Sequence, residues 1–240
     1  MKVLYTDIDG TLTGPLGNLF WDSERNTTPA AADAIVRAAR AGLEIVPVTG
    51  RSRAGMLELA RLLGFPHWFG ELGGLRIYDR GEQVVVDHGG EVDGTLIIEE
   101  LRRALRGMLE RFPGRIEEHA PWNESRIVSL VLRGGLGLEE AGAFLAEAGL
   151  DWATFVDNGV IPRRYESMPE VERVHAYHLV PRGVSKAAAI AADREHRGLA
   201  REDCAMVGDS RADVECAPEV ARCFLVRNGY AKDPGLAWTG

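Results

Sequence analysis

The first 63 residues alternate between short apolar stretches and helical patterns, and this alternation constrains the fold more than any other feature of the sequence. Residues 3–5 and 43–48 read as buried strands, whereas residues 27–40 and 52–63 carry helical patterns. A threonine–proline pair begins the first helical pattern, and glycine ends both. Strands that alternate with helices in this way are typical of a doubly wound parallel sheet, so we expect an α/β fold.

The same alternation returns near the end of the chain, after a long interruption. A helix over 184–196, a strand over 204–207, a helix over 213–217 and a strand over 223–226 are predicted there. The intervening pattern is mixed, with strands expected at 83–87, 126–132, near 155 and at 174–179, and helices at 94–112 and 138–148. We therefore expect a core of residues 1–79 and 178–240, interrupted by an inserted α+β module at 80–177. The tail from residue 229 is expected to be weakly ordered or an incomplete last helix.

The composition is that of a soluble globular protein, with 45% hydrophobic and 27% charged residues. A net charge of −8 argues against a nucleic-acid-binding surface but leaves room for small anionic substrates. No signal-peptide core or membrane-spanning run is visible. The three cysteines lack metal-type spacing, so we read them as reduced core residues of a cytoplasmic protein. The oligomeric state stays open.

Two carboxylates follow the first strand. Asp7 and Asp9 are two residues apart, so in extended chain both side chains point to the same side. Their mutual repulsion would be offset by a divalent cation, which prefers hard oxygen ligands. A strand end with two solvated aspartates before a turn is the simpler alternative. Asp209 follows a later predicted strand, and ligands of open parallel sheets bind outside the carboxyl ends of the strands.

Four segments in chain order strengthen the site interpretation. They are Asp7-Ile8-Asp9-Gly10, Val48-Thr49-Gly50-Arg51, Gly183-Val184-Ser185-Lys186 and Gly208-Asp209-Ser210-Arg211-Ala212-Asp213. Together they resemble the four motifs of the haloacid dehalogenase (HAD) superfamily, mostly phosphatases that work through an aspartyl-phosphate. The resemblance implies a Rossmann-like HAD core, in which residues 80–177 occupy the place of a C2-type cap that selects the substrate.

The resemblance also implies roles for the carboxylates. Asp7 is similar to the nucleophile that attacks phosphorus, and Asp9 to the general acid and base. Asp7, Asp209 and the backbone carbonyl of Asp9 would hold one Mg²⁺. Ser210 and Asp213 would support these ligands without binding the metal themselves. Asp213 would hold Lys186 or a metal-bound water in place. Simple stabilisation of a helix start is an equally open explanation of Asp213.

Phosphate-binding groups are implied as well. Thr49 would offer its hydroxyl and Gly50 its backbone amide to phosphate oxygens. Lys186 is one of only three lysines in a chain with 28 basic residues, and it begins a predicted helix, where the helix dipole disfavours a cation unless an anion binds there too. Arg51 shares this placement, and we weigh substrate contact equally against a solvated side chain.

The expected function is that of a Mg²⁺-dependent hydrolase of a small phosphomonoester, of the sugar phosphate, phosphoglycolate or glycosyl-phosphoglycerate class. A sugar phosphomutase of the same superfamily and a non-catalytic binding module are the alternatives. Two departures from the family pattern, Leu72 and Ala212, stand where many capped relatives carry asparagine. They remove amides near the expected substrate pocket and leave the nucleophile, the acid/base and the metal ligands in place.

Overall fold

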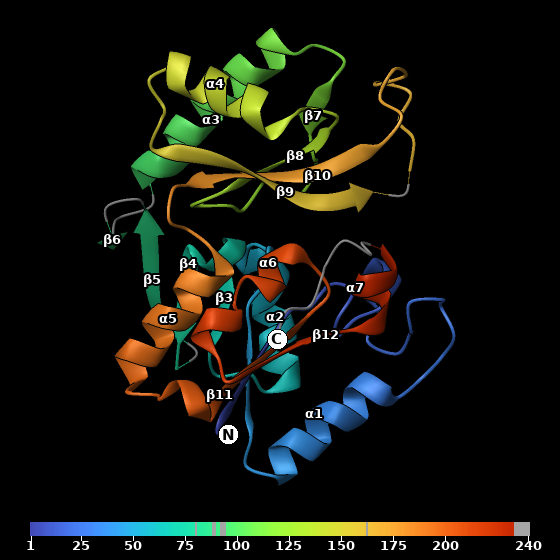
Figure 1. The fold of residues 1–240 in the computed structure, drawn as a ribbon, viewed down its shortest axis with the longest axis vertical. Coiled ribbons are helices and arrows are strands. Elements are labelled where there is room, and N and C mark those ends of the chain that lie inside the picture. The colour runs from blue at the N-terminus through green and yellow to red at the C-terminus, as the bar shows by residue number, and fades with distance from the viewer. Residues whose placement is uncertain (80, 88–89, 92–94, 162, 233–240) are drawn as a thin grey trace. The chain divides into compact units, whose positions relative to one another are not determined.

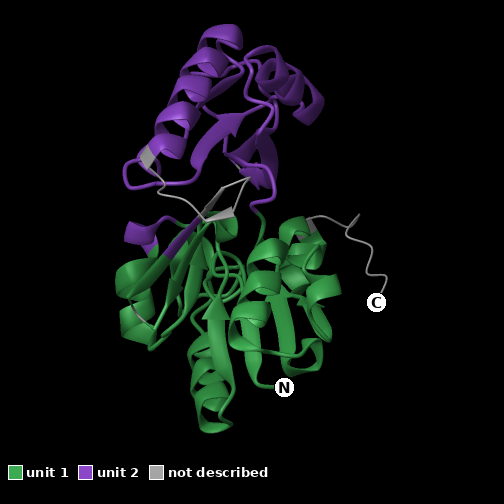
Figure 2. Ribbon diagram, turned by 90° about the vertical axis from the view of Figure 1, so that its left-hand side faces the viewer, with its two compact units in different colours: residues 1–51, 56–83, 185–240 green, residues 52–55, 84–184 purple. Residues whose placement is uncertain are grey.

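The computed structural model of the chain describes residues 1–79, 81–87, 90–91, 95–161 and 163–232 (Figure 1). Its internal contacts divide it into two compact units (Figure 2). Unit 1 comprises residues 1–51, 56–83 and 185–240, and unit 2 comprises residues 52–55 and 84–184. Among the described residues, no helix combines the length and apolar character needed to cross a membrane.

Unit 1 is built on a parallel sheet. Its strands lie in the order β12 (Arg222–Leu225), β11 (Cys204–Gly208), β1 (Val3–Thr6) and β2 (Glu44–Pro47). The strand β1 pairs in parallel with both β11 and β2, and the side chains of Val3 and Tyr5 are buried. The predicted α/β fold with a parallel sheet is confirmed.

The connections of unit 1 are helical where the sequence predicts helices. They are α1 (Ala30–Arg40), α2 (Arg53–Leu63), α5 (Lys186–Arg197), α6 (Arg211–Val214) and α7 (Arg227–Lys232). The Thr28 hydroxyl accepts the amide of Ala30, the first residue of α1, although Pro29 holds the N-cap position, and Gly42 at φ 66° follows the end of the helix.

An antiparallel extension follows α2. The strand β3 (Trp68–Gly70) pairs with β4 (Leu75–Tyr78), and β5 (Glu82–Asp87) and β6 (Gly90–Glu91) continue that sheet. Val48 forms a parallel bridge with Phe69, so this sheet meets the end of β2. Between β3 and β4 lies the short 3-10 turn η2 (Glu71–Gly73).

Unit 2 is an antiparallel sheet with two helices. The strands lie in the order β7 (Ile116–Glu118), β8 (Leu130–Gly134), β10 (Val174–Pro181) and β9 (Ala153–Ile161), and the helices are α3 (Thr95–Arg111) and α4 (Leu138–Glu147). Its core includes fully buried side chains from both helices and from β8, namely Leu101, Met108, Leu130, Leu132 and Leu145.

Three sequence predictions need adjustment. The strand expected at 126–132 begins only at Leu130, because the chain turns at 121–125 and bends again at 127–128. The strand expected at 174–179 is β10, which continues to Pro181. The helix expected at 213–217 begins at Arg211, because Ser210 caps it. The tail is helical to Lys232, and its residues 233–240 lie outside the described part of the chain.

Candidate active site

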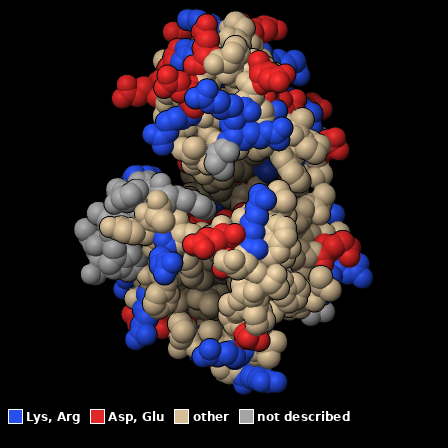
Figure 3. Space-filling model, turned by 90° about the vertical axis from the view of Figure 1, so that its right-hand side faces the viewer, with Lys and Arg blue, Asp and Glu red and all other residues tan. Residues whose placement is uncertain are grey.

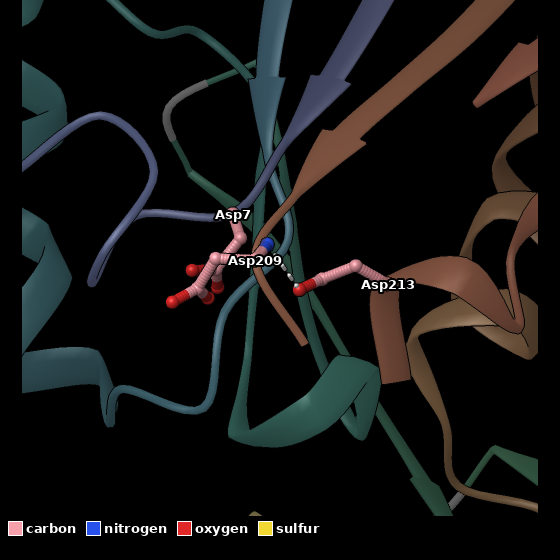
Figure 4. Close-up of side chains that lie close together, drawn as sticks. All are labelled: Asp7, Asp209 and Asp213. Carbon is pink, nitrogen blue, oxygen red and sulfur yellow. Dashed lines mark hydrogen bonds between the residues drawn. The ribbon is translucent and has the colours of Figure 1, made fainter. Parts of the chain in front are cut away.

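Three aspartates meet at the carboxyl edge of the parallel sheet. Asp7 follows β1, Asp209 follows β11, and Asp213 lies in the short helix α6 (Figure 4). One carboxylate oxygen from each lies within 4.8 Å of the others. The sequence predicted that Asp7 and Asp209 converge, and the structure adds Asp213 to the same cluster.

Lys186 joins two of these carboxylates. Its Nζ atom donates to Oδ1 of Asp7 and to Oδ1 of Asp213, at 2.7 Å in each case, and all three residues are buried. Lys186 is the first residue of α5, where Ser185 caps the helix by accepting the amide of Ala188. Removing either side of such a buried ion pair would leave an uncompensated charge, so these residues act as a unit.

The ionisation of the cluster follows from burial and from unequal charge. Burial raises the pKa of Asp7 to about 7; Lys186 opposes this shift, while Asp213 and Asp209 add to it. Burial alone would lower the pKa of Lys186, but the carboxylates of Asp7 and Asp213 raise it above its usual range. One ammonium among three carboxylates leaves excess negative charge, which favours a further cation.

Asp213 also shapes the loop that carries Asp209. Its Oδ2 accepts the amides of Asp209 at 3.1 Å and Ser210 at 3.0 Å, and the Ser210 hydroxyl at 2.6 Å. A Cβ atom at Gly208 would lie 2.1 Å from Cγ of Asp213, so only glycine permits this close packing. Of the two explanations weighed for Asp213, the structure shows both: it caps the start of α6 and it contacts Lys186.

The oxygen donors of the cluster suit magnesium. Both Asp213 oxygens already accept hydrogen bonds, so Asp7 and Asp209 are the carboxylates placed to hold a cation. Mg²⁺ takes one or two carboxylates and completes its octahedron with water and substrate oxygens. The donor set therefore fits the predicted ion.

Asp9 lies in a different arrangement from Asp7. The Arg51 guanidinium pairs with its carboxylate in a bidentate manner, Nε to Oδ2 at 2.7 Å and Nη2 to Oδ1 at 2.5 Å. The hydrogen bonds that Arg51 donates to Asp9 are the first cause of its raised pKa. Gly17, in the loop after Asp9, lies so close that a Cβ there would be 2.9 Å from Nη2 of Arg51. The carboxylate of Asp9 is thus held by Arg51, whereas the metal prediction concerned its backbone carbonyl.

The loop after β2 is braced by η2. The amide of Leu72 donates to the carbonyl of Thr49, and the amide of Glu71 donates to the carbonyl of Arg51. Leu72 is buried and has φ 59°, a left-handed conformation that is uncommon for a residue with a side chain. The Thr49 hydroxyl accepts the amide of Arg51 at 3.3 Å. Contact of Thr49, Gly50 and Arg51 with a phosphate stays a prediction.

Sequence reasoning missed one contact near the site. The Nδ2 atom of Asn228 donates to the carbonyl of Gly10 at 2.7 Å. Asn228 lies at the start of α7, at the edge of the tail that we expected to be weakly ordered, and no spacing rule links it to a turn 218 residues earlier.

A basic hollow lies in unit 2. It has a volume of about 230 Å³, and Arg163, Arg164 and Arg173 line it together with Glu172. Figure 3 shows Lys and Arg side chains gathered on this face of the unit. These arginines are exposed, and nothing else about the hollow indicates a bound group.

No family model matches the chain. Over 234 residues it is 28% identical to a phosphoglycolate phosphatase from Methanoculleus marisnigri, an alignment that covers 95% of this chain and 85% of the relative. A phosphoglycolate phosphatase from Metallosphaera sedula is 27% identical, with 98% of this chain and 88% of the relative covered.

Solved structures share the fold at lower identity. A protein from Thermoplasma acidophilum superposes with a TM-score of 0.65 at 20% identity, covering 96% of this chain and 88% of its own. The sucrose-phosphatase of Synechocystis, solved with sucrose and phosphate, has a TM-score of 0.61 at 16% identity, covering 94% and 82%. A HAD subclass IIB sugar phosphatase has a TM-score of 0.59 at 17% identity, covering 97% and 91%.

Proposed function

The chain is similar over nearly its whole length to phosphatases of the haloacid dehalogenase superfamily, as its four motifs predict, and on that premise we propose that it is a Mg²⁺-dependent hydrolase of a small phosphomonoester. The protein is an enzyme of the phosphatase class. Magnesium, the aspartyl-phosphate and the identity of the substrate are the parts of this proposal that experiment must test.

One observation carries the proposal: a buried lysine bridges Asp7 and Asp213 next to Asp209 at the edge of the sheet. Burying one cation and two carboxylates beside a third, half-buried one costs folding free energy unless the buried charges are compensated. A module that only bound a metabolite would not need a carboxylate nucleophile beside a cation site. An enzyme that transfers a phosphoryl group needs both, because catalysis there depends on positioning and on neutralising phosphate charge.

Each residue of the cluster then has a chemical role. An oxygen of Asp7 attacks phosphorus, the bond from phosphorus to the substrate's ester oxygen breaks, and the product is a phosphorylated Asp7. Lys186 restrains the attacking carboxylate and faces the incoming phosphate with a positive charge. Asp7, Asp209 and the Asp9 carbonyl would hold Mg²⁺, which supplies charge neutralisation to the phosphate.

Asp9 would act as the general acid and then as the general base. It donates a proton to the leaving alkoxide, and it then takes one from the water that hydrolyses the phosphorylated Asp7. Arg51 donates to both oxygens of Asp9 and so stabilises its charged form, and weakening this pair would make it easier for the carboxylate to receive a proton. A phosphate group entering beside Arg51 would compete for the same guanidinium, which couples substrate binding to the release of Asp9.

Phosphoglycolate is the first substrate to test, because two relatives that align over almost the whole chain are named as phosphatases of this compound. The assay is release of inorganic phosphate from phosphoglycolate, hexose phosphates and phosphoglycerates, with Mg²⁺ and with chelator. We expect Mg²⁺-dependent release that Asp7→Asn abolishes. Hexose phosphate isomerisation without free phosphate would instead indicate a mutase, and full activity in chelator would contradict the metal site.

A further inference from the structure

The start of α7 touches both loops of the proposed site. Asn228 donates a hydrogen bond from Nδ2 to the carbonyl of Gly10, the residue directly after Asp9. Gly10 has φ 92°, and its own amide donates to the carbonyl of Thr13 at 2.8 Å. The turn after Asp9 is therefore held by two hydrogen bonds, one within the turn to Thr13 and one from the distant residue Asn228.

The next residue, Gly229, lies against the other loop. It is buried, and a Cβ atom there would stand 2.4 Å from the carbonyl oxygen of Asp209 and 2.7 Å from its Cα. The segment is also tied to the end of β11, because the amide of Val226 donates to the carbonyl of Gly208 at 3.0 Å. Only a residue without a side chain allows this close an approach to the Asp209 backbone.

From these contacts we propose that Asn228 and Gly229 form a positioning segment that sets the turn after Asp9 at a fixed distance from the Asp209 loop. The inference rests on the proposed function, because the two loops carry the oxygens assigned to one cation. The flexible glycine after Asp9 makes the outer restraint necessary, since Gly10 could otherwise carry the turn into other conformations.

Magnesium makes such a restraint matter. Its ligands must come close to octahedral geometry at 2.0–2.1 Å, a stricter demand than Ca²⁺ makes. A turn that shifts by a fraction of an ångström would weaken Mg²⁺ binding while leaving the chemistry of the bound complex largely intact. A hydrogen bond that served stability alone would lower the melting temperature and leave the affinity for Mg²⁺ unchanged.

The experiment compares Asn228→Ala with Arg227→Ala, a change at the exposed neighbour in α7. The Mg²⁺ midpoint, the Mg²⁺ concentration that gives half of the full effect, is measured in two ways. One is the rise in melting temperature without substrate, and the other is the rate of phosphate release. We expect Asn228→Ala to raise both midpoints at least tenfold, with kcat at saturating Mg²⁺ within threefold of wild type. For Arg227→Ala, both midpoints and kcat should stay within twofold of wild type.

Gly229→Ala provides a second approach, because its methyl group would clash with the backbone of Asp209 and so disturb the segment at its other contact. This variant should also raise the Mg²⁺ midpoint. If it fails to fold, the Asn228→Ala variant alone tests the inference. The inference would be overturned by an Asn228→Ala variant that has a lower melting temperature in chelator but the wild-type Mg²⁺ midpoint. It would also be overturned if the melting temperature of the wild-type protein did not change with Mg²⁺. Wild-type protein that binds Mg²⁺ but releases no phosphate would defeat the proposed function, while the melting data would still test Asn228.

Discussion

Lys186 occupies a position that only a compact cation fits. Its Nζ atom makes two 2.7 Å hydrogen bonds, and the residue is 4% exposed. An arginine has a longer, planar head group that could not place one nitrogen between Asp7 and Asp213 without moving one of them. We predict that Lys186→Arg lowers kcat at least tenfold, about 1.4 kcal/mol of transition-state stabilisation. Lys2→Arg, at an exposed ion pair with Asp203, is the matched control and should be neutral.

Asp9 offers a test of its two assigned roles. As an acid it matters most for a poor leaving group, so Asp9→Asn should slow phosphorylation by an alkyl phosphate severely. It should affect p-nitrophenyl phosphate mildly, because that leaving group has a pKa of about 7. With the activated ester, loss of the base should make hydrolysis of the phosphoenzyme limiting.

Rapid mixing of Asp9→Asn with p-nitrophenyl phosphate should then show a burst of nitrophenolate that approaches one equivalent per site. Asp7→Asn should show no burst, which makes it the control. Equal damage to both substrates without a burst would mean that the Asp9 side chain has no acid/base role.

The residues that sequence reasoning located are those fixed by local geometry. Asp7 and Asp209 directly follow strands, so their meeting at one sheet edge follows from the parallel order. The pairing of Arg51 with Asp9 depends on side-chain directions that no local pattern encodes. Asn228 reaches Gly10 across the whole chain, and only the folded structure brings them together.

At the scale of elements, helix and strand positions were predicted well where the apolar periodicity is clear, as in α1 and α4. The observed bounds differ from the predicted ones where a side chain takes the place of a backbone hydrogen-bond partner. Asn123 supplies to Val131 of β8 the hydrogen bonds that a longer β7 would have made, and Ser210 begins α6 two residues before the expected start.

Ser210 therefore gives a prediction for α6. Its hydroxyl donates to Asp213 at 2.6 Å and is part of the capping box that starts the helix. Ser210→Ala should lower the free energy of unfolding by about 1 kcal/mol, the usual cost of losing a helix cap. The loss of this donor also frees Asp213 to move, so kcat should fall together with stability. Thr28→Ala, which removes the hydroxyl that accepts the amide of Ala30 at the start of α1, should also lower stability in urea titrations but leave kcat unchanged.

At the scale of the whole molecule, the parallel-sheet fold could be predicted because strand–helix alternation leaves few alternatives. The limits of the inserted module, expected at residues 80 and 177, stay a prediction, since a strand that crosses the upper limit, such as β10, gives the sequence no local signal of a boundary. The compact units place the return to the core at residue 185, next to the lysine of the site.

The division into units leads to the last prediction. Every side chain placed in the candidate site belongs to unit 1, whereas residues 84–184 form a separate core of their own. Replacing 84–184 by a short glycine–serine linker should therefore leave a folded unit 1 that hydrolyses p-nitrophenyl phosphate in the presence of Mg²⁺. The same variant should lose its preference among phosphoglycolate, hexose phosphates and phosphoglycerates, because discrimination needs contacts with the rest of the substrate. Asp7→Asn in the shortened chain is the control for contaminating activity. If the ranking of substrates survives unchanged, selection resides in unit 1, and the loop at 14–26, where Leu16 and Phe20 are exposed, becomes the segment to mutate.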